Sequence, residues 1–143
     1  MMTTVREILQ SKGDAVYSIQ PTETLATAVR QLNEHNCGSL VVCDGDRLVG
    51  ILTERDILHA VADLEDRLQE IPVESRMTSD VVTGSLDDPV ENVMGVMTDN
   101  RIRHLPIVET GKLAGLISIG DVVKAHHAQL SIENHYLKSY IQS

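Results

Sequence analysis

The feature that most constrains this chain is an internal repeat. Residues 50–56 read GILTERD and residues 115–121 read GLISIGD, so a glycine, two aliphatic residues, a hydroxyl residue and an aspartate recur in the same order 65 residues later. The same spacing joins further identical or similar pairs: Val16 and Val81, Leu40 and Leu105, Val42 and Ile107, Asp44 and Glu109, and Leu48 and Leu113. A repeat of this length indicates two copies of one supersecondary unit that bury a core together.

The copies begin upstream of these pairs, where VREIL (5–9) resembles VESRM (73–77) at a spacing of 68 residues. A three-residue difference in length therefore falls in the loop around Gly13. A unit of about 60 residues is marginally stable alone, whereas the whole chain of 143 residues can bury a sizeable core. We expect the copies to pack their sheets and helices around a pseudo-twofold axis, with two related clefts between them.

The residue pattern of each copy predicts the order strand, helix, strand, strand, helix. In the first copy, a strand at 16–19 is followed by a helix that begins at Pro21–Thr22. Strands at 39–43 and 48–52 follow, joined by a turn at 44–46. The second helix is capped by Thr53 and runs to about Leu64. In the second copy they are a strand at 81–83, a helix from Asp88–Pro89, a strand at 102–108, a turn at 110–111, a strand at 113–117, and a helix from Ser118. The crossover helix makes the first two strands parallel, and the tight turn makes the next pair antiparallel.

Apolar residues at helical spacing mark the buried faces of the two crossover helices. They are Leu25, Ala28, Val29 and Leu32 in the first copy, and Val90, Val93, Met94 and Met97 in the second. Asp88, Pro89 and Glu91 predict a helix start with a cap, a first-turn proline and a capping-box glutamate. The expected fold class is α+β, with two β-α-β-β-α repeats and short helices at the N-terminal and C-terminal ends.

Composition argues against several classes of function. The net charge of −9 disfavours nucleic-acid binding, because phosphate contacts need clustered Lys and Arg, and a chain with three Tyr and no Phe or Trp lacks a stacking platform for single strands. No apolar run approaches the roughly 20 residues of a membrane span. The N-terminus does not read as a signal peptide, so we expect a cytoplasmic protein.

The cysteines and histidines do not have the spacing of a metal site. Cys37 and Cys43 stand six residues apart and are interpreted as small buried hydrophobic residues, with a disulfide or redox role as the alternative. Of the six histidines, His126 and His127 are adjacent and point to different sides of a helix. No paired Cys or His spacing typical of a metal site occurs, so no metal is expected.

The chain resembles a tandem pair of CBS domains, the modules named after cystathionine β-synthase. The resemblance covers about residues 3–127 and rests on the repeated heptapeptides, on NRIRHLPIVETGKLAGLIS (100–118), and on Arg76, Met77 and Thr78. With it, we expect repeat 1 at about 3–65, a linker at about 66–72, repeat 2 at about 73–127, and a helical tail at about 128–143. The resemblance implies a regulatory module, not an enzyme, that binds an adenosine-containing ligand: AMP, ADP, ATP, a dinucleotide such as NAD, or S-adenosylmethionine.

The repeated heptapeptide has chemistry suited to a nucleotide. Its opening glycine lacks a Cβ, so a ligand or another backbone can approach closely. The strand ends where a helix begins, and the free N–H groups there suit phosphate. Asp56 and Asp121 can each accept both hydroxyls of a ribose, and Thr53 and Ser118 add hydroxyl groups. The open alternative is that each hydroxyl–aspartate pair is only a helix-capping box.

The resemblance implies two clefts, in each of which the hydroxyl–aspartate pair of one repeat meets the first strand of the other. The first cleft would gather Thr53, Asp56, Ile51, Leu52, Val81 and Val82, with Arg103 and His104 as phosphate donors. The second would gather Ser118, Asp121, Gly120, Lys12, Val16 and Tyr17. Gly38 and Ser39 replace the cations in the second cleft, so we expect the first to bind phosphate-bearing ligands better, with Lys12 compensating in part.

Two functions remain open from the sequence. One is an adenine-nucleotide sensor that signals to an unidentified protein, and the other is a ligand-independent protein–protein interaction module whose aspartates are only helix caps. No nucleophile–base pair, metal signature or glycine-rich phosphate loop suggests an enzyme. The tail AQLSIENHYLKSYIQS (128–143) carries apolar residues that either pack on the chain itself or form a contact in the homodimer that the resemblance implies.

Overall fold

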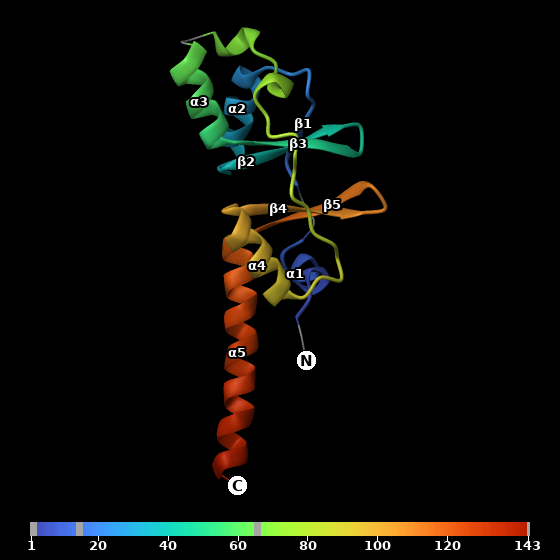
Figure 1. Cartoon of the computed structure of the whole chain (residues 1–143), viewed down its shortest axis with the longest axis vertical. Helices are drawn as coiled ribbons and strands as arrows, with labels where there is room; N and C mark the ends of the chain where they lie inside the picture. The colour runs from blue at the N-terminus through green and yellow to red at the C-terminus, as the bar shows by residue number, and fades with distance from the viewer. Residues whose placement is uncertain (1–2, 14–15, 65–66, 143) are drawn as a thin grey trace. The chain divides into compact units, whose positions relative to one another are not determined.

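The computed structural model describes residues 3–13, 16–64 and 67–142. The helices are α1 (Val5–Lys12), α2 (Leu25–His35), α3 (Glu54–Leu64), α4 (Val90–Asn100) and α5 (Ile119–Gln142), with short 3-10 turns η1 (Leu68–Glu70) and η2 (Val73–Ser75). The strands are β1 (Ser18–Ile19), β2 (Ser39–Asp44), β3 (Arg47–Thr53), β4 (His104–Glu109) and β5 (Lys112–Ser118) (Figure 1). The expected α+β class is confirmed.

Strand pairing follows the expected pattern. β1 pairs with β2 in parallel, and β2 pairs with β3 in an antiparallel hairpin whose turn contains Gly45 at a positive φ of 67°. The strand order is β1-β2-β3-β5-β4, and among the described residues Arg47 of β3 pairs with Lys112 of β5. The two crossover helices also end alike, because Asn36 and Arg101, 65 residues apart, both adopt the left-handed conformation after their last turn.

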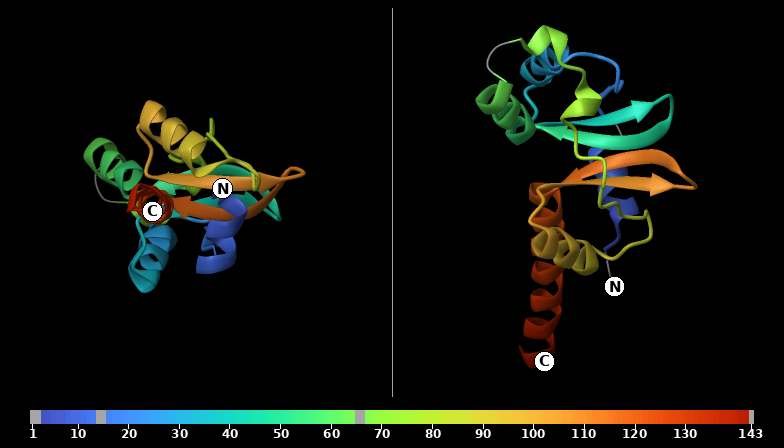
Figure 2. Two further views of the ribbon diagram at one scale, coloured as in Figure 1. Left: turned by 90° about the horizontal axis from the view of Figure 1, so that it is seen from below. Right: turned by 45° about the horizontal axis from the view of Figure 1, so that its top comes forward.

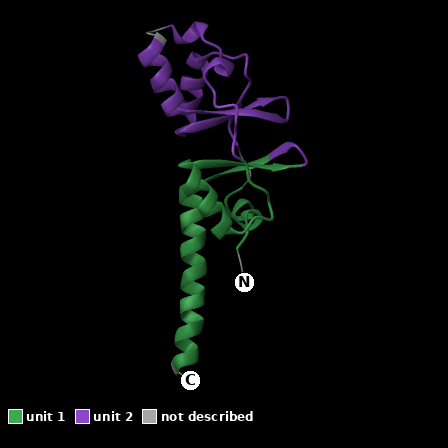
Figure 3. Cartoon of the chain, in the orientation of Figure 1, with its two compact units in different colours: residues 1–14, 83–109, 114–143 green, residues 15–82, 110–113 purple. Residues whose placement is uncertain are grey.

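The chain divides into two compact units that do not coincide with the two sequence copies (Figure 3). Among the described residues, unit 1 contains 3–13, 83–109 and 114–142, and unit 2 contains 16–82 and 110–113. The beginning of each copy therefore belongs to the unit formed mainly by the other copy. In unit 1, the N–H of Val5 donates to the carbonyl of Asp88 at 3.0 Å, and in unit 2, the N–H of Val73 donates to the carbonyl of Glu23 at 2.7 Å.

The core of unit 2 is aliphatic, as the scarcity of aromatic residues requires. In Figures 1 and 2, α2 and α3 lie over the same face of the β2–β3 hairpin. Their apolar faces and the strands form one buried cluster: Ile19, Leu25, Ala28, Leu32, Leu40, Val42, Leu52, Ala60 and Val73. Val29 was expected on the buried face of α2 but is 38% exposed, because it lies at the margin of that stripe.

The core of unit 1 draws on both ends of the chain. Its fully buried apolar residues come from α1, α4, β4, β5 and α5: Val5, Val90, Val93, Met97, Leu105, Ile107, Ile117 and Val122. Met94, expected on the same face of α4, is half-buried. Burying an aliphatic side chain of this size contributes about 1.5–3 kcal/mol, so α1 is an integral part of this unit.

Two helix starts differ from the prediction. α2 begins at Leu25 instead of Pro21–Thr22, because Thr24 provides the cap: its hydroxyl accepts from the N–H of Thr27 at 3.3 Å. α4 begins at Val90 with Pro89 as its N-cap residue, and the carboxylate of Asp88 accepts from the N–H of Ser85 at 2.8 Å. Asp88 therefore closes the preceding turn and does not cap the helix, so the predicted cap and first-turn proline are wrong.

The strand expected at 81–83 does not form, and β1 is shorter than expected at 16–19. The chain leaves unit 2 after Val82 and enters unit 1 at Thr83, so these residues cannot pair as one continuous strand. Pairing is restricted to an isolated parallel bridge between Gly84 and Ile107. A Cβ on Gly84 would lie 2.9 Å from Cδ2 of Leu105, so a larger residue there would force the Leu105 side chain to move.

The last helix of the second repeat and the expected C-terminal tail form one continuous helix. α5 runs from Ile119 to Gln142, and no proline and no glycine beyond Gly120 interrupts it. The C-terminal helix expected from the sequence is therefore present, as the continuation of the helix that starts after Ser118. In Figure 1, α1 and α4 lie beside the first part of α5, and the helix continues beyond them.

Candidate functional site

The aspartate of the first heptapeptide forms a reciprocal capping box at the start of α3. Oδ2 of Asp56 accepts from the N–H of Thr53 at 2.9 Å and from its hydroxyl at 3.1 Å, while the N–H of Asp56 donates to Oγ1 of Thr53 at 3.3 Å. Both residues are half-buried. These bonds satisfy N–H groups that the first helical turn leaves without intrahelical partners. The capping role considered from the sequence is therefore present in the structure.

The second heptapeptide repeats this geometry and adds a cation. Oδ2 of Asp121 accepts from the N–H of Ser118 at 2.8 Å, and the N–H of Asp121 donates to Oγ of Ser118 at 3.2 Å. The ammonium of Lys12, the last residue of α1, donates to the same Oδ2 at 2.6 Å and to the carbonyl of Leu116 at 3.1 Å. Lys12 was expected to supply charge for a ligand, but in this structure it neutralises Asp121.

The environment of Asp121 lowers its pKa. Partial burial of the carboxyl group raises the pKa, but the hydrogen bonds and charge of Lys12 and the hydrogen bonds from Ser118 outweigh burial. The ionised form of Asp121 is thus stabilised by contacts within unit 1.

The glycine that opens each heptapeptide makes room for a side chain of the same unit. A Cβ on Gly50 would lie 2.5 Å from Sδ of Met77, and a Cβ on Gly115 would lie 2.8 Å from Cδ1 of Leu9. The expectation was that a ligand or another backbone approaches these glycines. At Gly50 another backbone does so, since a Cβ there would lie 3.0 Å from the carbonyl oxygen of Thr78, while the side chains of Met77 and Leu9 fill the space where a ligand was considered. Sequence reasoning overlooked this contact, although the match of VREIL with VESRM already aligned Leu9 with Met77.

The apolar residues expected around adenine differ in exposure. Ile51 is 9% exposed, and its main chain exchanges two hydrogen bonds with Thr78, at 3.0 and 2.9 Å, so the segment before Val81 lies against β3 within unit 2. Val81 and Val82 are half-buried. Leu52 is fully buried in the core of unit 2, so its side chain packs against that core and only its backbone remains for a ligand.

The expected phosphate donors belong to unit 1, whereas Asp56 belongs to unit 2. Arg103 is exposed, and its carbonyl accepts from the N–H of Ile119 at 2.8 Å, so its backbone lies at the start of α5. His104 is half-buried in β4. The cooperation of Arg103 and His104 with Asp56 remains a prediction.

The other residues expected beside Asp121 also belong to both units. Val16 is half-buried and Tyr17 is 44% exposed, both in unit 2, and the ring of Tyr17 stacks on that of His35 with centroids 3.7 Å apart. This stacking was not foreseen. Gly120 in unit 1 has open space, since the nearest neighbour of a Cβ there would be Oγ of Ser118 at 3.7 Å.

Cysteines, metal ligands and membrane spans can be assessed in the described part of the chain. Cys37 and Cys43 are free thiols, and burial and the charge of Asp46 raise the pKa of Cys43. No group of three or more His, Cys, Asp or Glu side chains gathers among residues 3–13, 16–64 and 67–142. Within these ranges, every helix is too short or too polar to cross a bilayer.

Comparison with known families agrees with the internal repeat. The sequence profile of the CBS domain matches residues 5–63 and again residues 69–128. The chain belongs to the CBS-domain family. The resemblance seen in the heptapeptides is thus confirmed, and the family consists of regulatory modules that generally bind adenosine-containing ligands.

Relatives and solved structures support this assignment over most of the chain. The chain is 43% identical over 127 residues to an uncharacterized 17.7 kDa protein of Acidianus ambivalens, covering 87% of this chain and 74% of the relative. It is 34% identical over 149 residues to the mitochondrial CBS domain-containing protein CBSX3 of Arabidopsis thaliana, covering 98% and 72%. The crystal structure of a CBS-domain protein of Agrobacterium tumefaciens is similar at a TM-score of 0.82 and 39% identity, covering 87% of this chain and 99% of that one.

The matched CBS repeats show how the chain is exchanged between units. The first repeat begins with α1, which packs in unit 1, and the second begins at residue 69, in the segment that packs in unit 2. Gly50 of the first repeat thus receives Met77 of the second, and Gly115 of the second receives Leu9 of the first. Neither CBS repeat has a complete core without a segment of the other.

Proposed function

We propose that the chain is a regulatory CBS module that binds an adenine nucleotide, with Asp56 as the main ribose-binding carboxylate. The observation that carries this proposal is the presence of a cation at only one of the two similar capping boxes. Asp121 shares its Oδ2 with the ammonium of Lys12, whereas the hydrogen bonds of Asp56 come from Thr53 alone among the described residues. Asp56 therefore keeps more of its negative charge for a ligand.

Capping and ribose binding are compatible at Asp56. Its hydrogen bonds to Thr53 use Oδ2, and we assign Oδ1 to a ribose hydroxyl. A carboxylate is acceptor-only and offers about four lone-pair sites, so one oxygen can hold the helix start while the other accepts from a ligand. A hydrogen bond to a charged group contributes about 1.5–3 kcal/mol.

The remaining parts of an adenosine ligand are assigned by chemistry. We assign adenine to the aliphatic side chains of Val81 and Val82, which are half-buried in the same unit as Asp56, and to the small exposed part of Ile51. Arg103 and His104 are proposed to bind phosphate, because a guanidinium presents a fork of donors that matches phosphate oxygens. AMP, ADP, ATP and NAD share these groups. We propose that ligand binding shifts the protein between two conformations that a partner protein distinguishes, without catalysis by this chain.

The second candidate function is a ligand-independent interaction module. It is favoured by the reciprocal hydrogen bonds of both aspartates, which account for their presence as helix caps. Under this hypothesis no nucleotide changes the stability of the protein, and both aspartates contribute only to folding.

Thermal denaturation with AMP, ATP, NAD or S-adenosylmethionine separates the two functions. Ligand at about 100 times its dissociation constant adds about 2.7 kcal/mol to stability. For a domain of this size, that is a rise of about 5–10 °C in midpoint. A rise with at least one adenosine ligand supports the sensor function. Midpoints that stay unchanged with all four ligands, at millimolar concentration, exclude it in favour of the interaction module.

A further inference from the structure

The second half of α5 is uncovered in the described structure. Val122 is buried, and Gln129 is the last buried residue of the helix, where its Oε1 accepts from the N–H of Thr3 at 3.1 Å. From residue 130 to 141 every side chain is exposed, and several of these are large and apolar: Leu130, Ile132, Tyr136, Leu137, Tyr140 and Ile141. Large apolar side chains gathered on an exposed surface are typical of an interaction site, so a partner that buries them would stabilise this segment.

Some of the exposed residues of α5 follow each other at the spacing of a coiled-coil heptad repeat. Val123, Leu130 and Leu137 follow each other at intervals of seven residues, and His127, Asn134 and Ile141 alternate with them at intervals of three and four. These are the d and a positions of a heptad repeat, respectively. Leucine at d with a single asparagine at a is typical of parallel two-stranded coiled coils, because a buried Asn pairs best with its equivalent in the second helix.

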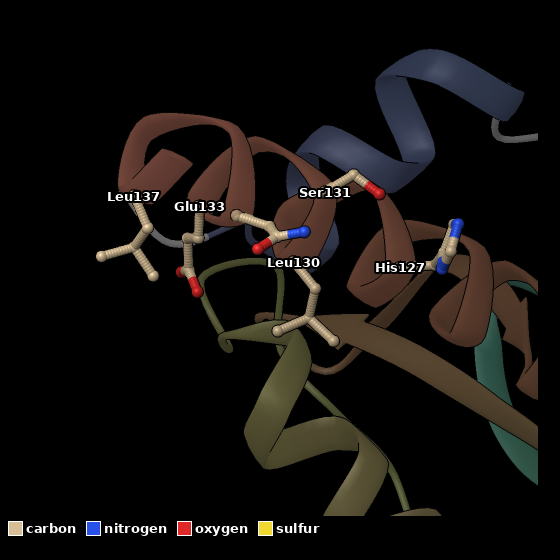
Figure 4. Close-up of a pocket in the computed structure, with 6 residues that line it drawn as sticks. His127, Leu130, Ser131, Glu133 and Leu137 are labelled. Atoms are coloured by element: carbon tan, nitrogen blue, oxygen red, sulfur yellow. The ribbon is translucent and has the colours of Figure 1, made fainter. Parts of the chain in front are cut away.

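The surface formed by these positions is hollowed. A shallow, open depression of about 430 Å³ lies between side chains of α5, and the residues that line it occupy a, d, e and g positions: His127, Leu130, Ser131, Glu133, Asn134 and Leu137 (Figure 4). Leu130 is 47% exposed and Leu137 is 60% exposed. A helix with protruding residues at the same heptad positions can fill such a depression by knobs-into-holes packing.

One pair of opposite charges beside the stripe favours a second copy in the parallel orientation. Glu133 occupies a g position and Lys138 the e position five residues later. In a parallel pair, a g residue lies beside the e residue of the following heptad in the other helix, so Glu133 of each copy would face Lys138 of the other copy. An antiparallel pair brings g to g and e to e, so Glu133 and Lys138 would no longer face each other. The sequence of α5 is thus complementary to itself in the parallel orientation.

We propose that α5 pairs with α5 of a second copy of this chain as a parallel two-stranded coiled coil over residues 127–141. This assigns an interface and an orientation to the homodimer expected from the family resemblance. The pairing is independent of nucleotide binding, so it can hold or fail separately from the proposed sensor function. Ile132 and Tyr136 lie at f and c positions on the outer side of the pair.

Disulfide cross-linking of the full chain tests orientation and register. Residue 141 lies beside its equivalent in a parallel, in-register pair, whereas residue 136 points away from the partner. Under mild oxidation, Ile141→Cys should form covalent dimers in most chains, while Tyr136→Cys should form no more than the wild type. The wild-type level measures any cross-linking through the native Cys37 and Cys43. Both positions are exposed, at 78% and 68%, so neither change disturbs the core. An antiparallel pair, or a dimer held elsewhere, leaves Ile141→Cys at the wild-type level and overturns the proposal.

Sedimentation equilibrium with matched double variants gives the second test. Leu130→Asp with Leu137→Asp should weaken association at least about thirtyfold, because both interface anchors become charged. Ile132→Asp with Tyr136→Asp carries the same charges on exposed residues outside the stripe and should associate like the wild type. Circular dichroism melts check that both variants fold. Equal association of the two folded variants contradicts a coiled coil along the a and d stripe.

Discussion

The ammonium of Lys12 lies 2.6 Å from Oδ2 of Asp121 and links the last residue of α1 to the first turn of α5. The same carboxylate oxygen accepts from the N–H of Ser118, so a single atom joins a helix cap and an ion pair. Both groups belong to unit 1. This ion pair distinguishes the two heptapeptides, because the carboxylate of Asp121 binds a cation of the protein itself.

Removal of this ion pair should change the stability of the protein with pH. Because the folded-state pKa of Asp121 is lowered, Asp121 contributes stability that is fully present above the ordinary Asp pKa of about 3.9 and is lost as the pH falls through the lower folded value. Lys12→Met should therefore lower the melting temperature at pH 5–7, and the difference from the wild type should shrink below about pH 4. Melting curves by circular dichroism between pH 3 and 7 measure this.

The matched control is Arg6→Met, which breaks the ion pair of Arg6 with Asp87. That pair has a distance of 3.2 Å, but its side chains are 45% and 86% exposed, so solvent screens it. We expect its loss to change the melting temperature little at any pH. A Lys12→Met curve that runs parallel to the wild type down to pH 3 would contradict the role of Asp121.

Alanine at the heptapeptide glycines should destabilise the fold. Gly50→Ala brings a Cβ against Sδ of Met77, and Gly115→Ala brings one against Leu9, so the neighbouring side chains must move. We expect each change to lower the free energy of unfolding by about 1–3 kcal/mol, the usual cost of overpacking. Urea denaturation measures it. Adding Met77→Ala to Gly50→Ala should remove the clash, although it opens space elsewhere.

Gly95→Ala is the control for the glycine variants. Gly95 lies in α4, and a Cβ there meets no described atom within 4 Å. Alanine should stabilise the protein by about 0.5–1 kcal/mol, because alanine loses less backbone entropy than glycine in a helix. If Gly50→Ala behaves like Gly95→Ala, the space beside Gly50 is not filled by Met77.

The two aspartates should differ in their effect on nucleotide affinity. Asp56→Ala should weaken AMP binding at least about tenfold, because a charged hydrogen bond to ribose is lost, and Asp121→Ala should weaken it less. Isothermal titration calorimetry measures both. Asp88→Ala controls for the loss of a structural carboxylate, since Asp88 accepts from Ser85 in a turn of unit 1. Unchanged affinity in Asp56→Ala would refute the assigned site even if the protein binds AMP.

Arg103→Ala should discriminate between phosphorylated and unphosphorylated ligands. If Arg103 binds phosphate, its removal weakens AMP binding more than adenosine binding, because adenosine lacks the group that a guanidinium recognises. Arg30→Ala, at an exposed position of α2, tests for a general effect of charge. Equal losses for AMP and adenosine would remove Arg103 from the phosphate site.

The sequence by itself determined most of the elements and their duplication. Leu40 corresponds to Leu105, and Asp56 to Asp121, at the same separation of 65 residues in the sequence. The apolar pattern also located the ends of β2, β3, β5 and α3 to within a residue or two. These features depend on residues close together in the chain, where side-chain alternation, turn residues and helix caps act locally.

Only the tertiary structure decided which segments share a core and what the repeated polar and glycine residues contact. That Leu9 fills the space beside Gly115, and that Lys12 neutralises Asp121, depends on α1 packing in the unit built mainly by the other repeat. Such contacts join residues about a hundred positions apart, and local propensity carries no information about them. They are set by the requirement that each unit bury a complete aliphatic core, which neither repeat can supply alone.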